Sequence, residues 1–170
     1  ELAETIPDHT AVVFKDRKYT YKELDELSNR LGKYIVSQGI GTEDVVSILI
    51  PRCEYMAVAP MGVIKAGAAY QPLDPTYPPG LVSCTCWRIL LPGFSSQTEG
   101  FTSGRRLSGT VLFTDEIPGL ADIKAELKKP QLHDLFILLY TSGSTGVPKG
   151  CMLEYGILLL SVTGSRDIMA

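Results

Sequence analysis

Two short apolar segments with a helical pattern between them constrain the fold of this chain most. Residues 45–50 form a mostly apolar run that Pro51 closes, and residues 68–73 form another. Apolar side chains at helical spacing occupy residues 54–66 between them, with Gly67 as a stop signal. Continuous apolar runs are typical of strands buried on both faces, and a strand–helix–strand order is typical of parallel sheets covered by helices. The sequence therefore predicts an α/β layered fold.

The N-terminal part predicts a hairpin that leads into an amphipathic helix. Residues 11–21 read as two short strands around a polar turn. Thr20 and Glu23 then match the Thr-x-x-Glu capping box, in which each side chain accepts a hydrogen bond from a backbone N–H at the helix start. Gly39 is placed to end this helix. The apolar side chains expected on its buried face are Leu24, Leu27, Leu31, Tyr34 and Ile35.

The second half of the chain is less regular. Residues 80–109 show neither a period of 2 nor one of 3.6 for long, and a structureless stretch of this length is uncommon in a compact domain. Regularity returns at residues 110–113, which predict a strand, and at residues 121–128, which predict a short helix. Residues 135–140 are fully apolar and predict a second strand in this half.

Composition and charge exclude several classes of function. The 170-residue chain has a net charge of -3 and no long run of Lys or Arg, so we expect no nucleic-acid partner. No apolar stretch approaches the ~20 residues that span a bilayer, and the start lacks a secretory-signal layout, so we expect no membrane partner and a cytoplasmic location. The cysteines and histidines lack metal-ligand spacing, so we predict no metal site; they are Cys53, Cys84, Cys86, Cys151, His9 and His133.

The loop that follows the strand at 135–140 carries the clearest chemical signal. Residues 141–150 read Thr-Ser-Gly-Ser-Thr-Gly-Val-Pro-Lys-Gly. Glycines allow the backbone to turn its N–H groups inward, hydroxyls add donors, and Lys149 adds positive charge, a combination that suits a polyphosphate. The loop is no Walker A motif, because Gly150 follows Lys149, and no GxGxxG supports a dinucleotide site. Composition alone would also fit a surface turn, with Lys149 as a solvated lysine.

Three segments in order resemble a known family. Residues 140–150 closely resemble the signature phosphate loop of the adenylate-forming superfamily, which contains acyl-CoA synthetases, luciferases and the adenylation domains of nonribosomal peptide synthetases. Residues 20–24 look like its first core motif. Residues 64–75 look like its second, and their Ala-Tyr-x-Pro-Leu-Asp-Pro ending is closest to amino-acid-activating domains. The resemblance implies a partial AMP-binding adenylation domain over residues 1–170, namely the N-terminal part of the large lobe, with layered sheets, packed helices and an incomplete fold.

The resemblance also implies a reaction and a set of partners. Such domains join an amino acid to ATP with Mg²⁺, giving an acyl-adenylate and pyrophosphate, and pass the acyl group to a phosphopantetheine thiol on a carrier domain. Carrier and condensation domains of the same synthetase would be partners. The loop would hold the ATP phosphates as charge builds on the leaving pyrophosphate. The residues expected to contact ATP are Thr141, Ser142, Gly143, Ser144, Thr145, Gly146 and Lys149.

The chain departs from the family pattern in two places. Residues 80–109 match nothing in it until family-like sequence resumes at Val111, and we hypothesise two compensating frameshifts, with a true insertion or divergence as the alternative. Residues 157–170 form an atypical tail, although a helix should begin after Tyr155.

We assign no catalytic residue within the chain. The first residue is not Met, so we expect a piece of a longer protein. In the family, the groups that bind adenine, ribose, the substrate side chain and Mg²⁺, and the catalytic lysine, lie downstream. We therefore expect the isolated chain to be inactive. An acyl-CoA or aryl-acid ligase fragment and an inactive remnant stay open as alternatives.

Overall fold

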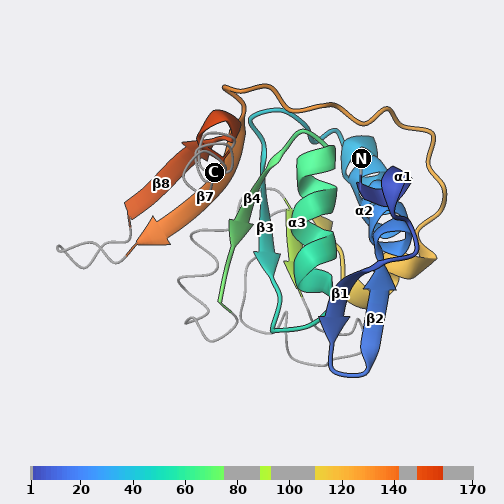
Figure 1. Cartoon of the computed structure of the whole chain (residues 1–170). Coiled ribbons are helices and arrows are strands. Elements are labelled where there is room, and N and C mark those ends of the chain that lie inside the picture. Colours follow the sequence, from blue (N-terminus) through green and yellow to red (C-terminus); the bar gives the residue numbers. More distant parts are fainter. Residues whose placement is uncertain (1, 75–88, 93–109, 142–148, 159–170) are drawn as a thin grey trace, which may run out of the picture.

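A computed structural model describes residues 2–74, 89–92, 110–141 and 149–158. These residues form a six-stranded sheet of order β6-β5-β3-β4-β7-β8, a separate β1-β2 hairpin, and helices packed beside the sheet (Figure 1). The elements are α1 (Leu2–Thr5), β1 (Thr10–Phe14), β2 (Arg17–Thr20), α2 (Tyr21–Ser37), β3 (Val45–Leu49), α3 (Tyr55–Lys65), β4 (Ala69–Pro72), β5 (Ile89–Pro92), β6 (Thr110–Val111), the 3₁₀ helix η1 (Thr114–Gly119), β7 (Leu135–Thr141) and β8 (Lys149–Glu154).

The predicted hairpin and capped helix at the N-terminus are confirmed. The strands β1 and β2 pair in antiparallel register, and α2 begins directly after them. The Glu23 backbone N–H donates to Thr20 Oγ1 at 3.2 Å, and the Thr20 N–H donates to Glu23 Oε2 at 2.8 Å. This reciprocal pair satisfies donors that a helix start otherwise leaves unpaired. Of the predicted core face, Leu24, Leu31 and Ile35 are buried, and the remaining two side chains are partly buried.

The predicted parallel α/β layer is also confirmed. Every residue of β3 is buried, as its apolar run requires. This strand pairs in parallel with β4 on one side and with β5 on the other, and β4 in turn pairs in parallel with β7. Alternate residues of β3 serve two cores: Val46 and Ile48 join the main core with α2 and α3, whereas Val45 packs with Ala69 and Leu138.

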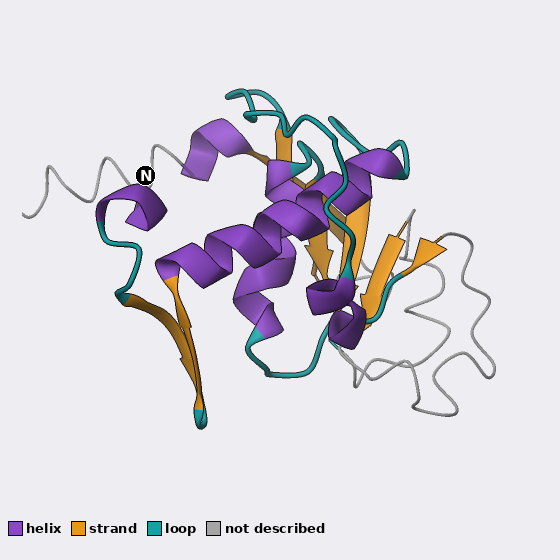
Figure 2. Cartoon of the chain, turned by 90° about the vertical axis from the view of Figure 1, so that its right-hand side faces the viewer, coloured by secondary structure: helices purple, strands orange, loops and turns teal. Residues whose placement is uncertain are grey.

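The helices α2 and α3 pack closely on each other, and Figure 2 shows them in front of the strands of the sheet. The close approach depends on two glycines: a Cβ at Gly32 would lie 3.0 Å from the Gly62 carbonyl oxygen. A partly buried polar network adds to this contact. Lys65 Nζ donates to Asp25 Oδ1 at 2.7 Å and to Asn29 Oδ1 at 2.8 Å. The helix α3 runs through Pro60, as its sequence pattern indicated.

The short helix predicted over residues 121–128 is wrong. This segment is extended and runs from η1 to β7 across the molecule (Figure 1). Ile123, Ala125 and Leu127 are partly buried, while the residues between them are exposed. Apolar side chains at every second position suit an extended segment that covers an apolar surface, and this period of 2 prevailed over the helix propensity of the Ala, Glu and Lys residues. A 3₁₀ turn precedes it at Thr114–Gly119 instead.

Two expectations in the irregular half are corrected in part. Four residues within the stretch 80–109, Ile89–Pro92, form the strand β5, which lies between β3 and β6. A run of this length carries too few residues for a period to be detected, and pairing in the sheet decides its structure. The strand expected at 110–113 is shorter than predicted, because η1 begins at Thr114 and only Thr110–Val111 pairs. No helix among the described residues has the length and apolar character to cross a bilayer.

Candidate functional site

The described residues of the predicted phosphate loop lie at the tips of two paired strands. The strands β7 and β8 form an antiparallel hairpin in which Thr141 stands opposite Lys149. The Thr141 hydroxyl donates to the Lys149 carbonyl oxygen at 3.4 Å. The structure thus brings these two predicted ATP contacts together at the mouth of the loop. The other predicted contacts, Ser142, Gly143, Ser144, Thr145 and Gly146, lie outside the described residues.

The position of the hairpin in the sheet suits a ligand site. The strand β7 is parallel to β4, with Tyr70 level with Ile137, and the loop leaves the carboxyl end of β7. In open α/β sheets, ligands bind outside the carboxyl ends of the parallel strands. Figure 1 shows the hairpin at the side of the sheet, with β8 as its outermost strand. The strand ends that carry Thr141 and Lys149 therefore lie at the side of the sheet.

Aromatic packing holds the base of the hairpin against its neighbours. Phe136 makes an edge-to-face contact with Tyr70 at a centroid distance of 5.5 Å and another with Tyr155 at 5.7 Å. The first contact joins β7 to β4, and the second joins it to the helical turn at 155–158, where the predicted helix begins. A Cβ on Gly150 would lie 3.5 Å from the Tyr140 ring, because these two residues face each other across the hairpin. Partial burial raises the pKa of Tyr70.

Lys149 supplies an available positive charge beside the loop. It is exposed, and no ion pair engages it within the part of the chain that the structure describes. A lysine ammonium donates in three directions and attracts phosphate oxygens as a point charge. In the described ranges, no three His, Cys, Asp or Glu side chains gather into a group that could hold a metal ion.

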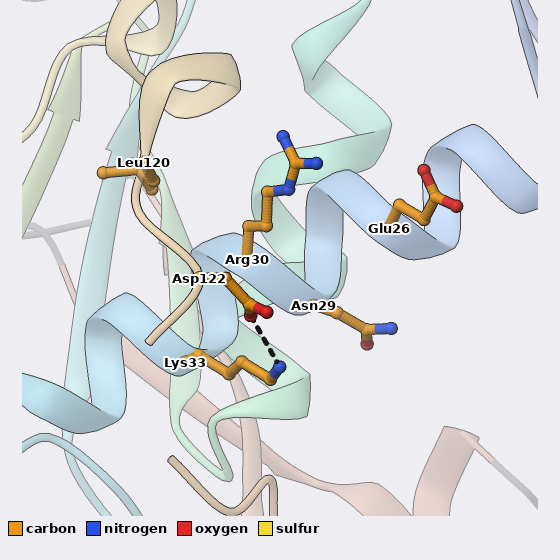
Figure 3. A pocket seen from close by; sticks show the side chains of 6 residues that line it. All are labelled: Glu26, Asn29, Arg30, Lys33, Leu120 and Asp122. Carbon is orange, nitrogen blue, oxygen red and sulfur yellow. Dashed lines mark hydrogen bonds and ion pairs between the residues drawn. The ribbon is translucent and has the colours of Figure 1, made fainter. Parts of the chain in front are cut away.

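A depression on the surface of α2 lacks the excess of positive charge that a phosphate site needs. It measures about 400 Å³ and is lined by Glu26, Asn29, Arg30, Lys33, Leu120 and Asp122 (Figure 3). Lys33 Nζ is paired with Asp122 Oδ1 at 3.1 Å, and Arg30 donates to a backbone carbonyl. Two cations and two carboxylates therefore balance within it. These contacts attach η1, through Pro118, and the segment after it, through Asp122, to α2.

Sequence reasoning missed the strand β8. Its residues Lys-Gly-Cys-Met-Leu-Glu are mostly exposed and show no clear alternation. A short run that begins with Lys-Gly reads as a loop, and the only available signal was the need for a return strand beside β7.

Comparisons with known proteins agree with the motifs and the fold. The AMP-binding enzyme family matches residues 1–85 and 93–169. Tyrocidine synthase 2 of Brevibacillus parabrevis is 38% identical over 154 residues, which cover 90% of this chain and 4% of that synthase. Gramicidin S synthase 2 of Brevibacillus brevis is 36% identical over 162 residues, which cover 91% of this chain and 3% of that synthase. The chain thus spans a few per cent of the length of these relatives.

A solved structure supports the same assignment. The nonribosomal peptide synthetase FmoA3, in a form with alpha-methyl-L-serine-AMP bound, matches with a TM-score of 0.75 and 26% identity over 90% of this chain and 17% of that chain. This likeness confirms the predicted fold, the N-terminal part of the large lobe of adenylate-forming enzymes. The chain belongs to the AMP-binding enzyme family and, within it, to the type of adenylation domain found in nonribosomal peptide synthetases.

Proposed function

We propose that this chain is the phosphate-holding part of an adenylation domain that activates an amino acid with ATP. In the proposed reaction, a carboxylate oxygen of the amino acid attacks the α-phosphorus, the bond to the β-phosphate oxygen breaks, and pyrophosphate leaves. A phosphopantetheine thiol of a carrier domain then takes the acyl group, and AMP is released. The observation that carries the proposal is the β7–β8 hairpin, which places Thr141 opposite Lys149 at the carboxyl edge of a parallel sheet.

The loop contributes electrostatic stabilisation to this reaction. Thr141, Ser142, Ser144 and Thr145 offer hydroxyl donors, Gly143 and Gly146 offer backbone N–H groups without a side chain beside them, and Lys149 offers positive charge. Fixed donors of this kind stabilise the charge that develops on departing pyrophosphate. Mg²⁺, when bound with ATP, would neutralise part of the same charge. The donor set fits phosphate oxygens, and the described residues provide no carboxylate cluster for the metal, so its protein ligands would come from elsewhere in the domain.

The proposed partners follow from the same assignment. They are ATP, an amino acid, and the carrier and condensation domains of one synthetase. We place the reaction in the cytoplasm, where ATP and amino acids are supplied.

Two other functions compete with this proposal. An acyl-CoA or aryl-acid ligase would use the same loop, and the sequence that follows in the gene would separate the two, since an aspartate that holds the substrate amino group marks amino-acid activators. An inactive remnant is the second competitor. Poorly cooperative melting of the purified chain, with no shift on adding MgATP, would favour the remnant.

A phosphate titration tests the role of the loop directly. We expect ³¹P NMR of inorganic tripolyphosphate to show weak binding to the 170-residue chain, and Lys149→Ala to abolish it. Lys18→Ala removes the same charge from an exposed position on β2 and should leave binding unchanged. Equal loss with both variants would mean that binding follows net charge and not the loop. We also expect no substrate-dependent ATP–pyrophosphate exchange by the isolated chain, and turnover would contradict this expectation.

We further propose that the stretch 80–109 results from two compensating frameshifts. The family model matches residues 1–85 and 93–169, so only residues 86–92 of this stretch lie outside the match, and the expectation that all of 80–109 lacks family-like sequence is too wide. Resequencing the coding DNA and translating the other two frames should yield an amphipathic helix with a Glu-Arg-Leu start. If neither frame yields one, the stretch is an insertion or a divergent segment.

A further inference from the structure

A groove between α3 and the extended segment that follows η1 combines an apolar floor with unbalanced positive charge. It has a volume of about 460 Å³. Its floor includes Met61 and Ile64 of α3 and Leu127 of the extended segment. Its lining contains three lysines and no carboxylate. This is a local excess of positive charge on a chain whose net charge is -3.

The three lysines are not equivalent. Lys65 is engaged, since its ammonium donates to Asp25, Ser28 and Asn29 within the helix pair. Lys128 and Lys129 are exposed, and no ion pair holds either of them among the residues that the structure describes. The depression on α2 differs, because its own carboxylates balance its cations (Figure 3). Of these two depressions in the described part of the chain, the α3 groove is the one that offers available cations beside an apolar floor.

The floor also has the properties of a contact surface. Met61 is 36% exposed, although it lies next to Gly62 at the packed helix crossing. Methionine adapts its shape to a partner, and apolar grooves rimmed by charge recognise amphipathic helices through apolar residues at i, i+3, i+4 and i+7. A free phosphate or a nucleic acid would use the rim and leave the apolar floor uncovered.

We propose that this groove docks an acidic amphipathic helix from a protein partner. Apolar side chains of that helix would cover Met61, Ile64 and Leu127, and its carboxylates would pair with Lys128 and Lys129. The groove reaches the base of the β7–β8 hairpin through Tyr155, but its lining does not include Thr141 or Lys149 at the other end of the hairpin, so the proposal does not depend on adenylation activity.

Fluorescence anisotropy with synthetic peptides tests the proposal on the 170-residue chain. The probe is a labelled amphipathic helix with leucines on one face and glutamates beside them. One control peptide replaces each glutamate by lysine, and another scrambles the sequence. We expect the acidic amphipathic peptide to bind at least about tenfold more tightly than either control, because both apolar burial and rim charges contribute. Equal binding of the three peptides would overturn the proposal.

Charge reversal on the protein locates the site. Lys128→Glu with Lys129→Glu should weaken binding of the acidic peptide by at least about tenfold. Lys18→Glu with Lys22→Glu makes the same change in charge at exposed positions outside the groove and should weaken it far less. If the two double substitutions weaken binding equally, the proposal is overturned. It is also overturned if the chain self-associates and only the Lys128→Glu/Lys129→Glu variant abolishes this self-association, because the groove would then bind a second copy of the chain.

Discussion

Replacing Gly62 by alanine tests the helix crossing on which the layered fold depends. A Cβ at this position would lie 2.6 Å from Leu31 Cδ2, 2.7 Å from Leu31 Cγ and 2.9 Å from Leu31 Cβ. Leu31 is fully buried in the main core. Rotation of the leucine side chain could move its Cδ2 atom, but its Cβ is fixed to the backbone of α2. The added methyl group therefore forces α2 and α3 apart.

Two opposing effects set the size of the change. Alanine in a helix interior is more favourable than glycine by about 1 kcal/mol. Overpacking a close-packed core costs about 1–3 kcal/mol, and the backbone-fixed contact places this case near the upper end. We therefore expect Gly62→Ala to lower the free energy of unfolding by about 2 kcal/mol, because the steric cost exceeds the gain in helix propensity.

Urea unfolding followed by far-UV circular dichroism measures this change. Gly119→Ala is the matched control, since its Cβ would meet no atom within 4 Å, and it should alter stability by no more than about 0.5 kcal/mol. In a double-mutant cycle, Leu31→Ala removes the contacts with Cγ and Cδ2 but keeps the contact with Cβ. It should therefore relieve the clash in part, and the two substitutions together should cost less than their sum. A Gly62→Ala chain as stable as the wild type would refute the argument that the glycine is required by the helix crossing.

Three further changes test other contacts. Thr20→Ala removes the capping box with Glu23 and should cost about 1 kcal/mol in urea unfolding, and an unchanged midpoint would mean that the cap contributes nothing. Lys65→Met leaves Asp25 without its ammonium partner and should cost about 1–2 kcal/mol, because Asp25 keeps partial access to water; a larger stability than the wild type would contradict this. Burial raises the pKa of Tyr55 from 10.0 to about 12, so the unfolded chain releases this proton first and stability should fall as pH rises between these values. Tyr55→Phe should flatten that alkaline fall, and an unaltered profile would assign it to other groups.

The sequence predicts the candidate site because the phosphate loop is a local sequence pattern. Ten consecutive residues carry the glycines, hydroxyls and lysine, and the preceding apolar run predicts the strand β7 that delivers them. The contact between Thr141 and Lys149 was not predictable, because it requires the return strand β8. The aromatic contacts of Phe136 were likewise hidden, since Tyr70 and Tyr155 are distant from it in sequence.

The sequence by itself determined the elements whose signals are local: the capped helix α2, the buried strand β3, the helix α3 and the loop chemistry after β7. Hydrogen bonds within a few residues and regular apolar spacing specify such elements without long-range information. Only the tertiary structure decided that residues 121–128 are extended, that Ile89–Pro92 enters the sheet, and that Lys128 and Lys129 face a shared groove. These features depend on surfaces supplied by residues far away in the chain, whose burial and pairing outweigh local propensity.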